Sequence, residues 1–247
     1  MKYEISKKYF FKGASAAGAH LLGRVARSDW NEERDCTAVL LQTVEHYQTA
    51  SGGTGEVRRE VWVRLPGKAP AEAGDMIAVT GDLILSTVGG GKYPVTFEAV
   101  ANPVWEHLGA APEALRGMNR ALLVGRVGKL RPISAAGNSG LAVSVAVTRM
   151  EEGSGREEIT DWHEAVFWGR RAENASRILG IGDTVMLTGC LACRSVKVDG
   201  KVRNLPGFLP DGFTLLHRKA ARAGASAAAA ARQPEQAEPL PDDPIPF

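Results

Sequence analysis

Apolar and polar residues alternate in several segments of the chain, and this alternation predicts β-strands. In residues 141–148 every second position is Leu or Val, and the positions between them are small or polar. This period of two is typical of a strand that buries one face. Residues 37–44 show a weaker form of the same pattern. Glycine-rich turns that would join such strands into hairpins occur in both halves of the chain, at residues 52–55, 89–91, 153–155 and 199–200.

Three sequence blocks occur twice, in the same order. The pairs are residues 21–25 with 123–127, 62–68 with 164–170, and 73–81 with 181–189. The first two pairs are 102 residues apart and the third is 108 residues apart. Three matching blocks in one order predict an internal duplication, which is the signature of repeated structural units.

The six additional residues of the second copy fall between Gly169 and Gly182. The segment between these glycines has apolar residues at helical spacing, namely Ala172, Ala175, Ile178 and Leu179. The corresponding segment of the first copy is shorter and contains Pro70, which disfavours a helix. We therefore expect one short helix, in the second copy only.

Five strands, two long hairpins and a helix after the third strand describe a small Greek-key barrel of the OB type. The predicted fold is all-β with one short helix: two tandem OB-fold (five-stranded Greek-key) barrels and a disordered C-terminal tail. The predicted boundaries are 1–105 for a first, diverged OB-fold domain, 106–117 for a linker, 118–219 for the second OB-fold domain, and 220–247 for the tail.

Charge is unevenly distributed along the chain. Residues 233–247 hold four acidic residues and no Lys or Arg, so the net charge of +2 for the whole chain leaves +6 for residues 1–232. A basic body favours a polyanionic partner, and an acidic end favours a different partner.

Several classes of protein are not indicated. No apolar run approaches the roughly 20 residues that span a bilayer, and the N-terminus lacks the apolar core of a signal peptide. We therefore expect a cytoplasmic protein without membrane contact. Cys190 and Cys193 have the spacing of half a zinc site, but no second ligand pair accompanies them, and on a strand they would point to opposite faces. No metal or other cofactor is expected.

An OB barrel that binds single strands needs a basic groove and aromatic rings on which bases stack. Trp162 and Trp168 would share one face of a strand, with Glu164 between them, whereas His163 and Phe167 would share the other. The alternative is that the tryptophans form the core. Glu164 argues against this alternative, because a charge is rarely buried without a partner.

Basic and aromatic residues that would line the same groove occur in both copies. In the second copy they are Arg126, Arg149, Arg170, Arg171, Arg194, Lys197, Lys201 and Arg203. In the first copy they are Trp62, Arg64, Arg24, Arg58, Arg59, Lys92 and Tyr93.

The second copy resembles a known family. Residues 118–127 (MNRALLVGRV) are similar to the opening strand of bacterial single-stranded-DNA-binding proteins, 161–170 to their third strand and 182–189 to their fourth. The resemblance covers residues 118–216 well and the first copy weakly. It implies single-stranded DNA as the ligand, stacking roles for Trp162 and Trp168, a nucleoid-associated location, and a homodimer that presents four OB domains. Arg149 and Val196 stand where relatives often carry further stacking aromatics.

The tail is rich in Ala, Pro, Gln and Glu and has few large apolar residues, so it is expected to be disordered. Its tip joins two acids to two apolar side chains: Asp242, Asp243, Pro244, Ile245, Pro246 and Phe247. This tip resembles the acidic Ile-Pro-Phe terminus through which the family recruits replication, recombination and repair proteins. Pro244 departs from the family pattern.

Alternative functions differ in how well the sequence fits them. Acidic residues such as Asp75 and Asp183 occur singly and the histidines are scattered, so the converging acids of a metal-dependent nuclease are not indicated, and no enzyme is expected. An RNA-binding OB-fold protein remains an alternative, because stacking and backbone contacts do not exclude RNA. An accessory paralogue from a mobile element or a stress response is a further alternative.

Overall fold

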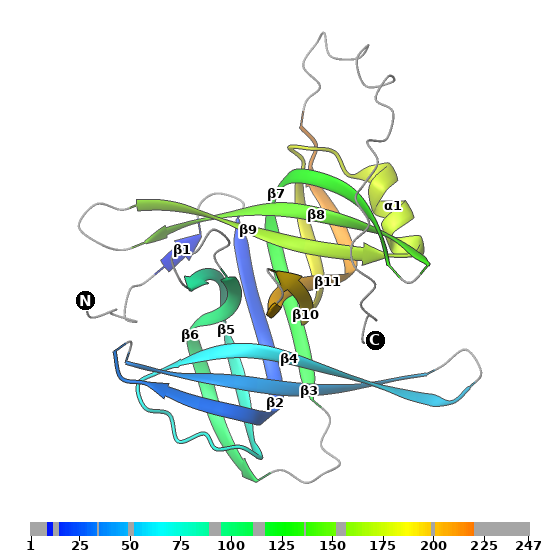
Figure 1. Cartoon of the computed structure of the whole chain (residues 1–247). Helices are drawn as coiled ribbons and strands as arrows, with labels where there is room; N and C mark the ends of the chain where they lie inside the picture. The colour runs from blue at the N-terminus through cyan, green and yellow to red at the C-terminus, as the bar shows by residue number, and fades with distance from the viewer. Residues whose placement is uncertain are drawn as a thin grey trace, which may run out of the picture.

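The computed structural model (Figure 1) describes the backbone of residues 9–11, 15–33, 35–48, 52–88, 95–110, 117–135, 137–151, 157–198 and 201–219. Side chains are described for residues 15–33, 35–46, 52–84, 103–110, 117–135, 137–150, 158–192 and 207–219. Within the described part, no helix has the length and apolar character needed to cross a membrane.

The second copy forms a closed five-stranded barrel. Its elements are β7 (Met118–Ala135), β8 (Asn138–Glu151), β9 (Glu157–Trp168), α1 (Arg170–Ile178), β10 (Thr184–Val198) and β11 (Lys201–His217). Neighbouring strands follow the order β7-β8-β9-β11-β10 and return to β7, and only the β9–β11 pairing is parallel. This is the OB arrangement that the sequence predicts, with the helix directly after the third strand.

The first copy repeats this arrangement without the helix. Its strands are β2 (Ala16–Asn31), β3 (Cys36–Gln48), β4 (Thr54–Pro66), β5 (Asp75–Val88) and β6 (Val95–Ala110). The strand order is β4-β3-β2-β5-β6, and β4 also contacts β6. The described residues between β4 and β5 form turns rather than a helix, as predicted from the shorter segment.

The repeated sequence blocks make equivalent hydrogen bonds in both barrels. The N–H of Gly74 donates to the carbonyl of Val25 at 2.9 Å, and the N–H of Gly182 donates to the carbonyl of Val127 at 2.7 Å. The φ angles of the two glycines are 99° and 93°, in a region that residues with a Cβ rarely adopt. The aspartate after each glycine accepts a hydrogen bond at 2.9 Å from the backbone N–H three residues earlier. The Gly-Asp blocks therefore recur because each one closes the same turn.

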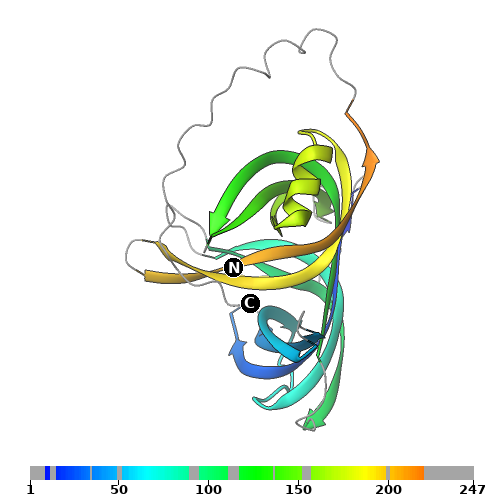
Figure 2. The same ribbon diagram turned by 90° about the vertical axis from the view of Figure 1, so that its right-hand side faces the viewer.

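The two barrels are joined by their first strands. β2 and β7 pair antiparallel, so one sheet runs through both barrels in the order β6-β5-β2-β7-β10-β11. Ala19 pairs with Ala121, which is its own counterpart at the offset of 102. The pairing is therefore symmetric about a pseudo-two-fold axis between these alanines. Figure 2 shows the barrels one above the other, with strands of both running along one side.

The linker begins later than predicted. β6 continues to Ala110 and pairs with β5 as far as Asp75, so residues 106–110 belong to the first barrel. Hydrogen bonds to β5 extend the strand through residues 106–110. Gly109 in this segment had favoured a linker in the sequence. Residues 220–247, predicted to be a disordered tail, lie outside the described residues.

Candidate nucleic-acid interface

The two tryptophans predicted as a stacking platform both lie on β9, which shares a sheet with β8 and β7. Trp162 of β9 pairs with Ala146 of β8, which pairs with Arg126 of β7, and Trp168 pairs with Gly140 further along β8. The side chain of Trp162 is 54% exposed, and that of Trp168 is partly exposed.

The other face of β9 points into the barrel. His163 and Phe167 are 0% and 1% exposed, so the prediction of two faces is confirmed. The alternative, in which Trp162 and Trp168 form the core, is wrong.

Glycines on neighbouring strands make room for both indole rings. A Cβ added to Gly128 of β7 would collide with the six-membered ring of Trp162, and a Cβ on Gly140 would lie 2.8 Å from Cε3 of Trp168. Each ring therefore lies over a backbone that has no side chain. This packing holds the rings against the barrel surface and leaves part of each ring open to solvent.

Small side chains of β8 lie between the tryptophans and the basic residues of β7. The outward positions of β8 are Gly140, Ala142, Ser144, Ala146 and Thr148. Because none of these residues is large, the face has a shallow floor, with β9 on one side and β7 on the other. A strand of nucleic acid laid along it would meet aromatic rings on one side and guanidinium groups on the other.

Two basic residues of this face were not predicted from the sequence. Lys129 and Arg131 pair with Ser144 and Ala142, on the same side as Arg126. A register shift after Val127 places them there, because the additional residue of a β-bulge reverses the alternation of the strand. A bulge is not visible in the pattern of residues 126–131, although Gly128 is the kind of residue that marks one.

Glu164, which lies between the two tryptophans along β9, has a basic neighbour. Nη2 of Arg131 lies 3.5 Å from Oε2 of Glu164. This ion pair offsets the one carboxylate that would repel phosphates in the middle of the face.

Helix α1 begins next to Trp168. Arg170 and Arg171 occupy its first two positions and are exposed, as is Arg126 on β7. The structure thus brings Trp162, Trp168 and Arg126 to one face of the second barrel, and Arg170 and Arg171 follow directly after Trp168 in the chain.

Arg149 does not belong to this face, so its prediction as a DNA contact is corrected here. Its side chain lies on the core side of β8 and is 8% exposed, and its Nε lies 2.7 Å from Oδ2 of Asp161. Arg149 continues the alternation of Leu141, Val143, Val145 and Val147, so it lies on their buried face, where the pair with Asp161 holds it inside the end of the barrel.

The first barrel presents a reduced version of the same face. Trp62 and Arg64 of β4 pair with Leu40 and Ala38 of β3, and Arg24 of β2 lies on the same side. The side chains of all three predicted residues are partly exposed. Leu40 takes the place of the small residues that form the floor in the second barrel, and β4 offers one tryptophan instead of two.

Two further arginines of the first barrel have acidic partners. Arg58 is exposed and pairs with Glu56, and this hydrogen bond lowers the pKa of Glu56. Arg59 faces inward, with Nη1 at 2.7 Å from Oε2 of Glu45. Through Glu45, Arg59 lies beside the contact between the barrels, and its role as a DNA contact stays a prediction.

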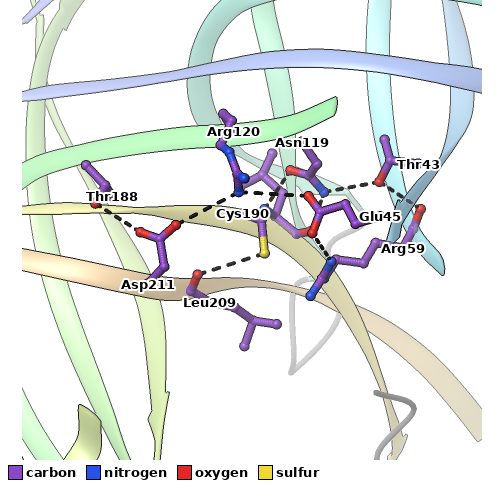
Figure 3. A network of polar contacts seen from close by, with 10 residues as sticks. Thr43, Glu45, Arg59, Asn119, Arg120, Thr188, Cys190, Leu209 and Asp211 are labelled. Atoms are coloured by element: carbon purple, nitrogen blue, oxygen red, sulfur yellow. Dashed lines mark hydrogen bonds and ion pairs between the residues drawn. The ribbon is translucent and has the colours of Figure 1, made fainter. Parts of the chain in front are cut away.

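Figure 3 shows that contact. Nη1 of Arg120, on β7, lies 3.9 Å from carboxylate oxygens of both Glu45 in the first barrel and Asp211 in the second. Asn119 is fully buried beside it and binds the backbone N–H and carbonyl of Leu191 at 2.9 and 2.8 Å. The amide of Asn119 thus continues the β7–β10 pairing where the backbones separate.

Cys190 lies in the same region and is buried. Burial raises the pKa of its thiol, which keeps it protonated at neutral pH. Within the described residues, no group of three or more His, Cys, Asp or Glu could hold a metal ion.

Some predicted contacts fall outside the described side chains. These are Arg194, Lys197, Lys201 and Arg203 on the β10–β11 hairpin, Lys92 and Tyr93 after β5, and the tip Asp242–Phe247. The backbone of the hairpin is described and pairs Lys197 with Val202 and Val196 with Arg203.

Two OB barrels joined through their first strands place the chain in the OB-fold class. The model of the single-strand binding protein family matches residues 118–205. Single-stranded DNA-binding protein 1 of Clostridium acetobutylicum is 33% identical over 106 residues, which are 41% of this chain and 96% of that protein. Single-stranded DNA-binding protein 2 of Streptococcus agalactiae is 29% identical over 107 residues, 42% of this chain and 82% of that protein. The chain belongs to the single-strand binding protein family.

A solved structure resembles both barrels together. The crystal structure of the wild-type single-stranded DNA binding protein from Thermus aquaticus matches with a TM-score of 0.61 and 21% identity, covering 87% of this chain and 100% of that one. The tandem arrangement of the barrels is therefore a known fold.

Proposed function

We propose that this protein binds single-stranded DNA without sequence preference and protects it during replication, recombination and repair. The observation that carries the proposal is the face of the second barrel, where Trp162 and Trp168 lie over glycines beside Arg126. Stacking of a base on an aromatic ring contributes about 1–3 kcal/mol and accepts any base. The proposal places the protein in the cytoplasm, at the nucleoid, and includes no catalytic step.

The test is a titration that follows tryptophan fluorescence with single-stranded DNA, matched RNA and duplex DNA at two salt concentrations. We expect quenching by single-stranded DNA and an affinity that falls as salt rises, because phosphate contacts release counterions. Trp162→Ala is expected to weaken binding by about 1–3 kcal/mol. Trp105→Phe is the matched control, since Trp105 packs against the core. Equal affinity for duplex DNA would end the proposal, and tighter binding of RNA would favour the RNA-binding alternative.

Recruitment of DNA-processing proteins is the second part of the proposal. The support is the sequence of the tip, where Asp242 and Asp243 precede Ile245 and a terminal Phe247. Burial of the Phe side chain in a pocket of a partner would contribute about 1.5–3 kcal/mol, and basic residues of the partner would bind the carboxylates. Deletion of Phe247 is expected to abolish capture of a repair or replication protein and to leave DNA affinity unchanged. A loss of folding on this deletion would contradict the proposal.

A homodimer with four OB domains is the third part. Its support is the open face of the six-stranded sheet that runs through both barrels, which exposes apolar side chains from β6, β7 and β11. They are Val104, Leu108, Met118 and Leu216.

A further inference from the structure

A buried aspartate ties three segments of the second barrel together. Asp183, in the turn before β10, is 4% exposed. Its Oδ2 accepts a hydrogen bond from the N–H of Gly180 at 2.9 Å, and its Oδ1 accepts one from the N–H of Lys219 at 3.0 Å. Its backbone carbonyl accepts a third, from the N–H of Val127 on β7, at 2.8 Å. Asp183 therefore joins the turn after α1, the segment after β11 and the first strand of the barrel.

The contact with β7 lies beside the bulge that carries the ring of Trp162. Val127 also accepts a hydrogen bond from the N–H of Gly182 at 2.7 Å, so both of its backbone polar groups are bound to this turn. The register of β7 with β8 shifts between Val127 and Lys129, which places Gly128 in the bulge. The ring of Trp162 lies where a Cβ of Gly128 would be. The turn therefore fixes the position of the backbone on which the ring lies.

Pairing within the sheet fixes the strand of Trp162 but not the floor beneath its ring. Trp162 pairs with Ala146 of β8, and further along, β8 pairs with strand β1 (Tyr9–Phe11) at residues 149–151. These pairings hold the backbone of β9. The ring itself lies over Gly128 of β7. A loosened turn would therefore move the ring and leave the strand in place.

The two residues that follow β11 at a distance of one and two positions fold back over the same turn. Nη2 of Arg218 donates to the carbonyl of Ile178, the last residue of α1, at 3.2 Å. The side chain of Lys219 covers Gly182, because a Cβ on this glycine would lie 3.3 Å from Nζ of Lys219. Together with the hydrogen bond from the N–H of Lys219 to Asp183, these contacts attach the beginning of the C-terminal segment to the turn.

The first barrel contains the same turn without a ring above it. Asp75 accepts hydrogen bonds at 2.9 Å from the backbone N–H of Glu72 and from the ring of His107, and the register of β2 with β3 shows the matching bulge. At the offset of 102, Ala26 stands in place of the bulge glycine and Glu60 in place of the tryptophan. The turn thus serves folding in both barrels, and in the second it also lies beneath an aromatic ring.

We propose that Asp183 and Lys219 are positioning residues for the ring of Trp162. They hold Val127 and Gly128 at the level on which the ring lies, and so keep one face of the ring open for a base. The inference rests on the proposed binding of single-stranded DNA. It makes the beginning of the C-terminal segment part of the structure that supports the binding face.

The position of the ring is measured by fluorine NMR of the full chain labelled with fluorotryptophan. The chain has five tryptophans, and Trp162→Phe identifies the line of Trp162. In Asp183→Asn the side chain offers an acceptor to only one of the two N–H groups, so we expect this line to shift or broaden in the absence of DNA. Asp75→Asn is the matched control in the first barrel and is expected to leave the line unchanged. An unchanged line in Asp183→Asn, or an equal change in Asp75→Asn, would overturn the proposal.

DNA affinity separates a positioning role from general stabilisation. Asp183→Asn is expected to weaken binding of single-stranded DNA by about 5-fold, the lower end of the range for one lost stacking contact. In a chain that already carries Trp162→Ala, the same change is expected to weaken binding no further, because two changes that act through one contact are not additive. A further loss of the same size would show that Asp183 acts on the barrel as a whole, and the proposal would be wrong. A wild type that does not bind single-stranded DNA would contradict the proposed function, whereas the fluorine lines would still decide the positioning role.

The role of Lys219 is tested at an exposed position, so this test remains available if Asp183→Asn does not fold. Lys219→Pro removes the N–H that binds Asp183, and Lys219→Ala keeps it. Both variants lose the same charge, so the comparison isolates this hydrogen bond. We expect Lys219→Pro to change the line of Trp162 in the same direction as Asp183→Asn, and to bind DNA more weakly than Lys219→Ala. Equal lines and equal affinities for the two variants would overturn the role proposed for Lys219.

Discussion

Gly128 leaves the space in which the ring of Trp162 lies, and its substitution tests how much that position matters. In Gly128→Ala the new Cβ would collide with ring atoms of Trp162. The ring is 54% exposed, so it is free to turn away without disturbing the core. We expect weaker binding of single-stranded DNA, by up to about 1–3 kcal/mol for one lost stacking contact, and an unchanged thermal midpoint.

Fluorescence titration and calorimetry of the same preparation measure both quantities. Gly207→Ala on β11 is the control, because the nearest atom to its Cβ would be the carbonyl oxygen of Ala192 at an ordinary 3.6 Å. DNA binding by Gly128→Ala equal to that of the wild type would show that the position of the Trp162 ring has no role.

Arg126 and Arg149 are both on the β7–β8 pair, and their environments predict opposite effects. Arg149 is paired with Asp161 in the interior, so Arg149→Met leaves a buried carboxylate. Removal of one partner of a buried pair costs about 3–5 kcal/mol of folding free energy. Arg126 is exposed, so Arg126→Met is expected to change stability by less than about 0.5 kcal/mol.

Urea unfolding measures the stability of both variants, and titration at two salt concentrations measures their binding. Arg126→Met is expected to reduce the salt slope by about 0.7, which corresponds to one phosphate contact on a single strand. Arg149→Met is expected to bind with the slope of the wild type under conditions where it remains folded. A reversal of these two results would restore Arg149 to the DNA face.

At the scale of strands, the sequence predicts the features that depend on repeated blocks and on the alternation of apolar and polar residues. The Gly-Asp blocks locate the start of β5 and β10 because the same turn is closed by the same hydrogen bonds in each barrel. The alternation of β8 and β9 separates Trp162 from His163 correctly. The absence of a helix between β4 and β5 follows from chain length and Pro70.

Features that depend on a neighbouring strand were not predictable in this way. The bulge in β7 turns Lys129 and Arg131 towards the tryptophans, and only the register with β8 reveals it. Pairing with β5 keeps Glu106 and His107 within β6. Arg59 and Glu45 lie on opposite strands of the β3–β4 hairpin, and their ion pair depends on the register of that hairpin.

At the scale of the whole molecule, the duplication explains how the two barrels are arranged. β2 and β7 are counterparts at the offset of 102, and each pairs with the other in a symmetric register. The contacts around this pairing have diverged. Arg120 bridges acids from both barrels, whereas its counterpart at the offset of 102 is Gly18, which has no side chain to make such a contact. The first barrel thus packs against the second and also carries a reduced version of the face proposed to bind DNA.

The open face of the joined sheet leads to the last prediction, which concerns assembly. Val104 and Met118 are 79% and 44% exposed on β6 and β7, and burial of such side chains between two copies would stabilise a dimer. Val104→Glu with Met118→Glu would place two carboxylates in that interface, where an unpaired charge is costly. We expect the wild type to sediment at about twice the chain mass of 26.3 kDa and the double variant as a single chain. Ile181→Glu is the control, because Ile181 is 62% exposed in the turn after α1, away from the six-stranded face. A wild type that sediments as a single chain would contradict the homodimer, and equal sedimentation of dimeric wild type and double variant would move the interface to another surface.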